Sequence, residues 1–148
     1  MVDTKQLYKL IWMSRPLMQS AEAAVERGLK GIGLTVRTRA VLEVLLVEKE
    51  ASVPDIAEKL EIKRQYVQLM VNETITEGLT VKRENPRHKR STLIALTQKG
   101  QALIEDVVQR EMKLVRSIGD GLNAADIETA LKVVTTLTEN LKTELGSG

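Results

Sequence analysis

Apolar residues recur at intervals of three and four along most of the chain, which is the spacing of an amphipathic helix. Residues that commonly cap helices stand ahead of several of these runs, among them Thr35, Ser52 and Asn123. The predicted helices cover about residues 4–29, 36–48, 53–60, 63–77, 98–118 and 124–145. The pattern therefore predicts a chain that is mainly helical.

Two short segments, 80–84 and 92–96, have the composition of β-strands instead. The polar turn Asn85–Ser91 separates them, so the region is predicted to form a β-hairpin. The hairpin follows two helices that are joined by a tight turn at Glu61–Ile62. This order of elements is that of a winged helix-turn-helix, so the predicted fold class is mainly α with a small β component (α+β).

The segment 34–100 is predicted to be a compact winged helix-turn-helix lobe that binds DNA. The segments 1–33 and 101–145 contain long amphipathic helices, whose apolar stripes must be buried. Because the lobe is too small to cover all of them, we predict that these are dimerisation helices covered by a second copy of the chain. Packing within one chain is the alternative. Residues 146–148 are expected to be a flexible tail.

The composition excludes several kinds of site. The 148 residues include no cysteine and one histidine, so we expect no disulfide, no metal site and no catalytic triad. Paired carboxylates, a glycine-rich phosphate loop and an activated nucleophile are also absent from the sequence, so we expect no catalytic residues, no cofactor and no enzymatic activity. No apolar run is long enough to span a membrane and no signal peptide is recognisable, so we expect a cytoplasmic protein without a membrane partner.

The net charge of +2 conceals an uneven distribution. Residues 82–90 contain five basic side chains and one acidic side chain, whereas residues 101–148 contain five basic and eight acidic ones. A basic hairpin in a nearly neutral protein suggests contact with phosphate groups. A solvated loop is the alternative interpretation.

The second helix of the predicted helix-turn-helix, about residues 63–77, is expected to lie in the major groove as the recognition helix. Arginine, glutamine and asparagine side chains can form paired hydrogen bonds with base edges, and lysine or serine can contact phosphates. The candidate DNA-binding residues are Ser52, Lys63, Arg64, Gln65, Tyr66, Gln68, Asn72, Arg87, His88, Lys89 and Arg90. The last four belong to the wing, about residues 80–96, which is expected on the DNA backbone or minor groove. An ordinary solvated helix face is the competing interpretation for the helix.

These motifs resemble the MarR (multiple antibiotic resistance regulator) family of winged helix-turn-helix transcriptional regulators. The resemblance covers nearly the whole chain and is densest from Leu34 to Gly100. The phrases that support it are Ser52–Leu60, Glu77-Gly78-Leu79, the wing from Lys82 to Leu96, and Leu96-Thr97-x-x-Gly100. The resemblance implies a homodimeric regulator, typically a repressor, that binds double-stranded DNA at a pseudo-palindromic operator. It also implies release of the DNA when a small aromatic effector ligand binds.

The sequence departs from the family pattern at positions that matter for DNA recognition. Gln65 and Tyr66 stand where family members often have serine and threonine, so no operator sequence can be transferred. His88 stands where an aspartate commonly anchors the wing. His88 is interpreted either as a solvated wing residue or as a donor near phosphate. Tyr66 either contacts the DNA backbone or packs its ring against the base of the hairpin.

Tyr8 and Trp12 are four residues apart and share one face of the first helix, with Met13 nearby. In the family the first helix borders a ligand cavity, so these three residues are candidates for an effector pocket. Packing in the dimer interface is the alternative. For the protein as a whole, the alternative function is a winged-helix module for protein contacts without specific DNA binding, which the basic hairpin disfavours.

Overall fold

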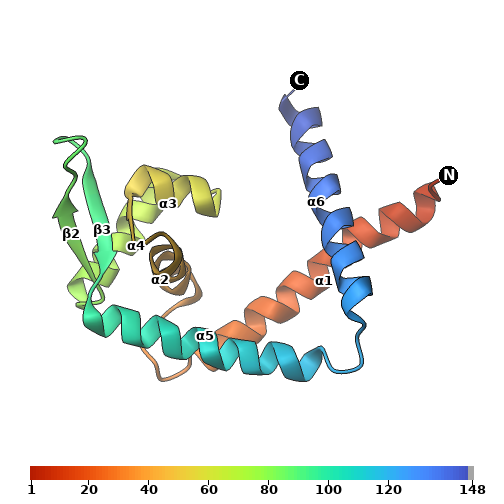
Figure 1. The fold of residues 1–148 in the computed structure, drawn as a ribbon, viewed down its shortest axis with the longest axis horizontal. Helices are drawn as coiled ribbons and strands as arrows, with labels where there is room; N and C mark the ends of the chain where they lie inside the picture. The colour runs from red at the N-terminus through yellow and green to blue at the C-terminus, as the bar shows by residue number, and fades with distance from the viewer. Residues whose placement is uncertain (147–148) are drawn as a thin grey trace. The chain divides into compact units, whose positions relative to one another are not determined.

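The computed structural model describes residues 1–146 and contains six helices and three strands in that range (Figure 1). The elements are α1 (Thr4–Gly28), α2 (Val36–Glu48), β1 (Glu50–Ser52), α3 (Val53–Leu60), α4 (Arg64–Thr76), β2 (Thr80–Glu84), β3 (Thr92–Leu96), α5 (Gln98–Ile118) and α6 (Ala124–Gly146). The mainly helical fold with a small antiparallel sheet confirms the predicted fold class. The chain divides into two compact units, Met1–Met112 and the part that begins at Lys113.

The sheet has the strand order β1-β3-β2, and both pairings are antiparallel. β2 and β3 form the predicted hairpin, with Lys82 opposite Ile94. β1 was not predicted from the sequence, because three residues are too few to show an alternating pattern. It pairs Ala51 with Ile94 and so attaches the start of α3 to the hairpin.

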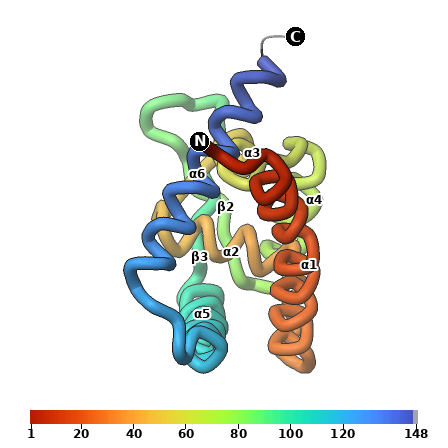
Figure 2. The backbone as a smooth tube through the Cα atoms, turned by 90° about the vertical axis from the view of Figure 1, so that its right-hand side faces the viewer, coloured from red at the N-terminus to blue at the C-terminus, as the bar shows by residue number. Residues whose placement is uncertain are grey.

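Two apolar clusters make up the core of the first unit. One lies between α2, α3, α4 and the sheet, and its members are Val41, Leu45, Ala51, Ile56, Ala57, Val67, Met70, Val71 and Ile94. The other joins the end of α1 to α2 and α5 through Leu29, Leu34, Leu42, Leu79, Ile104 and Val107. Since α2 contributes to both clusters, it is the central support of the lobe (Figure 2).

Local capping explains why the helices of the lobe start where they do. Thr35 and Thr38 form a reciprocal capping box at the start of α2. At α3 the Ser52 hydroxyl accepts a hydrogen bond from the Asp55 amide at 3.3 Å. Ile62 does not belong to the core, since its side chain is 40% exposed. Ile62 lies in the turn after Glu61, outside both helices.

The Glu77–Leu79 turn and the start of α5 form one hydrogen-bonded junction. Gly78 has a φ of +75°, a conformation that glycine adopts without strain, and ends α4. Thr97 donates its hydroxyl to Gly78 O at 2.7 Å and its amide to Leu79 O at 3.0 Å. The same hydroxyl accepts the Gly100 amide at 3.0 Å. The Leu96-Thr97-x-x-Gly100 phrase therefore joins the end of α4 to α5.

Arg39 connects α2 to α5 through a partly buried group of charges. Its Nε donates to Oε2 of Glu111 at 2.6 Å, a second nitrogen donates to the other oxygen of Glu111, and a third donates to Glu43 at 2.5 Å. The hydrogen bonds to Glu111 raise the pKa of Arg39, and burial opposes them only in part. Two helices of the first unit are thus fixed to one another by a bidentate ion pair.

The second unit consists of the end of α5 and of α6. The Asn123 side chain caps α6 by accepting the Ala125 amide at 2.7 Å. None of the residues described in α6 is buried within this chain, although the helix has an apolar stripe. Its exposed large apolar residues are Ile127, Leu131, Val134, Leu141 and Leu145. Of the tail predicted at 146–148, Gly146 ends α6, and the other two residues lie outside the described part of the chain.

Candidate nucleic-acid interface

The helix-turn-helix is formed by α3, a three-residue turn and α4. Glu61 ends α3 in the left-handed conformation, with a φ of +55°. The Ile62 amide donates to Ala57 O at 3.1 Å, and Lys63 then begins α4 as its N-cap. This sharp reversal allows Ala57 and Val67 to pack together in the core and turns the outer face of α4 to solvent.

The two faces of α4 differ completely in burial. Val67, Met70, Val71 and Thr74 are buried, and Thr74 donates or accepts a hydrogen bond with Thr80 of β2 at 2.8 Å. The five predicted contact residues of α4 are all exposed: Arg64, Gln65, Tyr66, Gln68 and Asn72. Gln65, Gln68 and Asn72 lie on the face opposite the buried residues, with the exposed Leu69 among them, whereas Arg64 and Tyr66 lie toward the two sides of the first turn. The contact of these residues with DNA stays a prediction.

Two of these residues are joined to each other. Nε2 of Gln68 donates a hydrogen bond to Oδ1 of Asn72 at 2.9 Å. The residues are four apart, which places their side chains in neighbouring turns on the same helix face. The spacing in the sequence allows this contact, and the side-chain geometry shows that the two residues form a pair.

The wing loop is held by an asparagine that the sequence analysis did not single out. Oδ1 of Asn85 accepts the Arg87 amide at 3.0 Å, and its Nδ2 donates to the Ser91 hydroxyl at 2.9 Å. The backbone of His88 takes part in the same turn, because its amide donates to Asn85 O and its oxygen accepts the Ser91 amide. An amide side chain thus anchors this wing.

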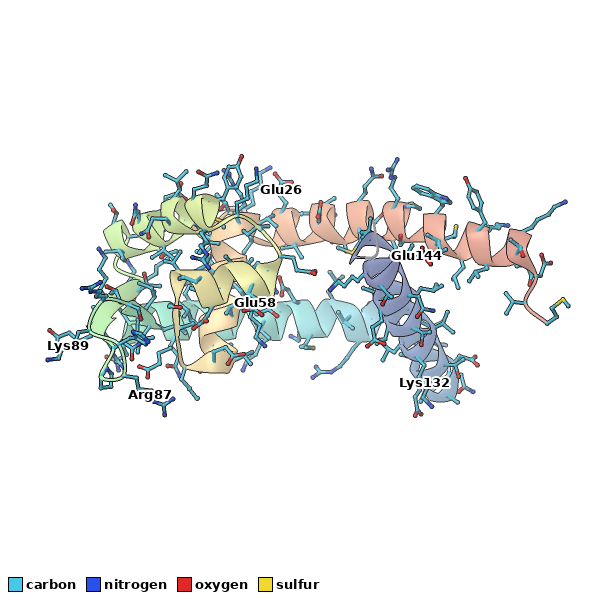
Figure 3. The ribbon with its side chains drawn as sticks, turned by 90° about the horizontal axis from the view of Figure 1, so that it is seen from above. Glu26, Glu58, Arg87, Lys89, Lys132 and Glu144 are labelled. Atoms are coloured by element: carbon cyan, nitrogen blue, oxygen red, sulfur yellow. The ribbon has the colours of Figure 1, made fainter. Side chains whose placement is uncertain are left out.

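The four predicted wing residues, Arg87, His88, Lys89 and Arg90, are all exposed. Figure 3 shows Arg87 and Lys89 projecting from the hairpin tip, away from the body of the lobe. Because Asn85 holds the loop through its own side chain, the side chains at the tip are available for contacts outside the chain. Their role in DNA binding stays a prediction.

The adjacent basic residues of β2 lie on opposite sides of the hairpin, as the alternation of a strand requires. Lys82 lines a groove together with Gln68 of α4 and Arg90 of the wing. Arg83 lines a separate hollow on the other side and forms an ion pair with Glu50 at 3.9 Å. Lys82 is therefore an additional candidate contact residue, which the alternation of side chains along the predicted strand could have separated from Arg83.

The groove has a volume of about 300 Å³ and runs between the start of α3, the middle of α4 and the base of the hairpin. Its lining residues are Ser52, Val53, Pro54, Gln68, Lys82, Arg90, Ser91, Thr92 and Ile94. Ser52, a predicted phosphate contact, is only 8% exposed, and its hydroxyl already accepts the Asp55 amide. The structure thus gives Ser52 a capping role, and its predicted contact with phosphate is not tested.

Tyr8, Trp12 and Met13 lie on α1, which precedes the winged helix-turn-helix lobe in the chain. All three side chains are more than half exposed. Tyr8 and Trp12 meet edge to face with ring centroids 6.1 Å apart, and the Arg15 guanidinium lies over the Trp12 ring at 5.5 Å. Tyr8 and Trp12, with Arg15, form an accessible aromatic patch within α1, and the roles of Tyr8, Trp12 and Met13 in an effector pocket or a dimer contact stay predictions.

The fold and the polar face of α4 define a winged helix-turn-helix protein. A sequence profile described as "MarR family" matches residues 32–91. The crystal structure of a MarR family transcription regulator is 34% identical, with a TM-score of 0.88 over 98% of this chain and 96% of the other. The chain belongs to the MarR family of transcription regulators.

Two solved structures of lower identity share the fold, and a further protein is similar in sequence. A cysteine-to-serine mutant of Escherichia coli MarR, crystallised with operator DNA, is 18% identical, with a TM-score of 0.78 over 92% of this chain and 99% of the other. BpsR of Bordetella bronchiseptica, studied for regulation of its DNA binding by 6-hydroxynicotinic acid, is 22% identical, with a TM-score of 0.75 over 88% and 98%. The uncharacterized protein Rv2011c of Mycobacterium tuberculosis is 28% identical over 109 residues, which are 72% of this chain and 76% of the other.

No helix in the described part of the chain has the length and apolar character needed to cross a membrane.

Proposed function

We propose that this protein is a homodimeric, sequence-specific DNA-binding regulator that represses transcription until a small ligand binds. In this proposal α4 enters the major groove and the wing contacts the backbone or minor groove. The observation that supports it best is the division of α4, where apolar residues are buried and the arginine and amide side chains are exposed beside a basic hairpin. Arginine and amide side chains are those that read base edges in the major groove.

The apolar residues of α6, and those of α1 such as Leu17 and Met18, support the homodimer. They are exposed in the single chain, and a stripe of this size is normally covered in solution. Two-fold symmetry of the dimer would match a pseudo-palindromic operator, as in other dimeric helix-turn-helix proteins. Sedimentation velocity is expected to give twice the chain mass of 16.5 kDa at micromolar concentration. A monomer under these conditions would contradict the proposal.

The central test is selection of bound fragments from a genomic pool, followed by anisotropy measurements on the enriched site. We expect enrichment of one sequence class and an affinity that falls steeply with salt, because lysine and arginine contacts displace counterions. Equal binding to unrelated DNA, or no binding at low salt, would favour the alternative of a winged-helix module for protein contacts.

Regulation by a ligand is proposed by comparison with BpsR, whose DNA binding is described as regulated by 6-hydroxynicotinic acid. Trp12 is the single tryptophan, so its emission reports directly on the patch with Tyr8. Salicylate-like compounds are expected to quench this emission and to release the enriched DNA at the same concentrations. An unchanged emission across the millimolar range would contradict a pocket at this patch. Emission that changes only when the dimer is diluted would assign Trp12 to the dimer interface.

A further inference from the structure

Gln68 and Asn72 are both expected to read bases, but the hydrogen bond from Nε2 of Gln68 to Oδ1 of Asn72 makes them interdependent. We propose that they read DNA as one unit, in which Gln68 recognises adenine and Asn72, with its oxygen held by Gln68, recognises guanine. This inference rests on the proposed function, because it assigns base preferences to the same face of α4.

The pair leaves each side chain with a different set of available donors and acceptors. A side-chain amide has two N–H donors and one oxygen with two lone pairs. Gln68 uses one N–H in the pair and keeps its oxygen and its second N–H. A free acceptor beside a free donor is the combination that pairs with N6 and N7 of adenine.

Asn72 is left with more available donors than acceptors. The Gln68 N–H occupies one lone pair of the Asn72 oxygen and turns that oxygen toward Gln68, while both N–H donors of Asn72 remain available. In the major groove, guanine presents two acceptors, O6 and N7, whereas adenine presents one acceptor and one donor. The pair therefore directs Asn72 toward guanine, although an asparagine with a free oxygen pairs best with adenine.

Gln68 thus has two roles, as a base-reading residue and as a positioning residue for Asn72. Both side chains are exposed, so the bond between them has little effect on folding. Gln68 also lines the groove with Lys82 and Arg90, whose charges suit neighbouring phosphates. We therefore expect the consequence of losing the bond to appear in base preference and not in stability.

The test is selection from a randomised DNA pool with the full-length parent and three variants. Asn72→Ala identifies the base that Asn72 contacts, as the position where the preference disappears. At that position the parent is expected to prefer guanine by about 5- to 150-fold. Gln68→Met, which keeps the length of the side chain but frees the Asn72 oxygen, is expected to change the preference there to adenine. Gln109→Met, which removes an exposed amide from α5, outside the proposed DNA-binding surface, is the matched control and should leave guanine preferred.

The possible results distinguish the base preferences proposed for Gln68 and Asn72 from DNA binding by the protein. A parent that prefers adenine at this position, a guanine preference that survives Gln68→Met, or an Asn72→Ala variant that loses no preference would overturn the paired reading. Those results would leave DNA binding itself intact. Failure of the parent to enrich any sequence would instead overturn the proposed function. Thermal unfolding within a few degrees of the parent, as expected for good helix formers at exposed positions, verifies that the variants are folded.

Discussion

Gly100 approaches the backbone of Leu79 so closely that a β-carbon at position 100 would lie 1.9 Å from the Leu79 carbonyl oxygen. It would also lie 2.8 Å from the carbonyl carbon, and neither atom is the end of a flexible side chain. The approach allows Thr97 to bond to both Gly78 O and Leu79 O. Position 100 therefore requires a glycine for space, although its helical backbone does not.

Gly100→Ala is expected to lower the free energy of unfolding by about 3 kcal/mol, because the backbone must shift to admit the methyl group. The gain from alanine's higher helix propensity, about 1 kcal/mol, is too small to offset this. Gly28→Ala is the control, since a β-carbon there has open space in α1. Urea unfolding at equal protein concentrations measures both, and equal stability of the two variants would contradict the close contact.

Arg39→Lys is expected to make stability sensitive to moderately alkaline pH. The hydrogen bonds to Glu111 raise the pKa of Arg39, so its stabilising charge is fully present below the ordinary arginine range and is lost only as the pH rises through the folded-state pKa. A lysine keeps the charge at neutral pH but loses it near its own pKa of about 10.4. The difference in unfolding free energy between parent and variant should therefore be constant up to about pH 10 and increase as the pH rises above about 10.4. A difference that stays constant through this upper range would contradict an ion pair at this position.

Lys82→Gln and Arg83→Gln are expected to differ in DNA binding, although each removes one positive charge from the same strand. Lys82 faces the groove beside Gln68, whereas Arg83 faces the other side of the hairpin and pairs with Glu50. Lys82→Gln should reduce the slope of log affinity against log salt by about 1, and Arg83→Gln should leave it nearly unchanged. Anisotropy titrations on one DNA site at several salt concentrations measure both slopes. A slope that is the same for Lys82→Gln as for the parent would show that Lys82 does not contact a phosphate.

Asn85→Ala is expected to loosen the wing loop, because it removes the hydrogen bonds to the Arg87 amide and the Ser91 hydroxyl. Three trypsin sites, at Arg87, Lys89 and Arg90, lie inside this loop and report on its opening. Cleavage within the wing should be several-fold faster than in the parent. Asn123→Ala, which removes a cap at the other end of the chain, should leave wing cleavage unchanged. An unaltered cleavage rate in Asn85→Ala would show that the loop is held by other contacts.

Local signals were sufficient to predict most elements of the fold. The capping residues Thr35 and Ser52 and the turn at Gly78 act within a few residues, so their effects are visible in the sequence. The strand β1 and the exposed Ile62 could not be predicted in this way, because their environments depend on segments distant in the chain.

The same distinction applies to the candidate site. The exposed face of α4 follows from helical periodicity once the apolar positions are assigned to the core. The bond between Gln68 and Asn72 depends on side-chain rotamers, and the ion pair of Arg39 joins residues that are 72 positions apart. Periodicity contains no information about either contact.

The hydrogen bond from the Thr97 amide to Leu79 O has a consequence for how this fold tolerates change. Leu79 and Thr97 immediately flank the hairpin, so the two ends of the hairpin are held together at one point. Residues inserted into or deleted from the wing tip need not move either end. The tip of the wing can therefore vary in length and sequence, while α4 and α5 keep their connection.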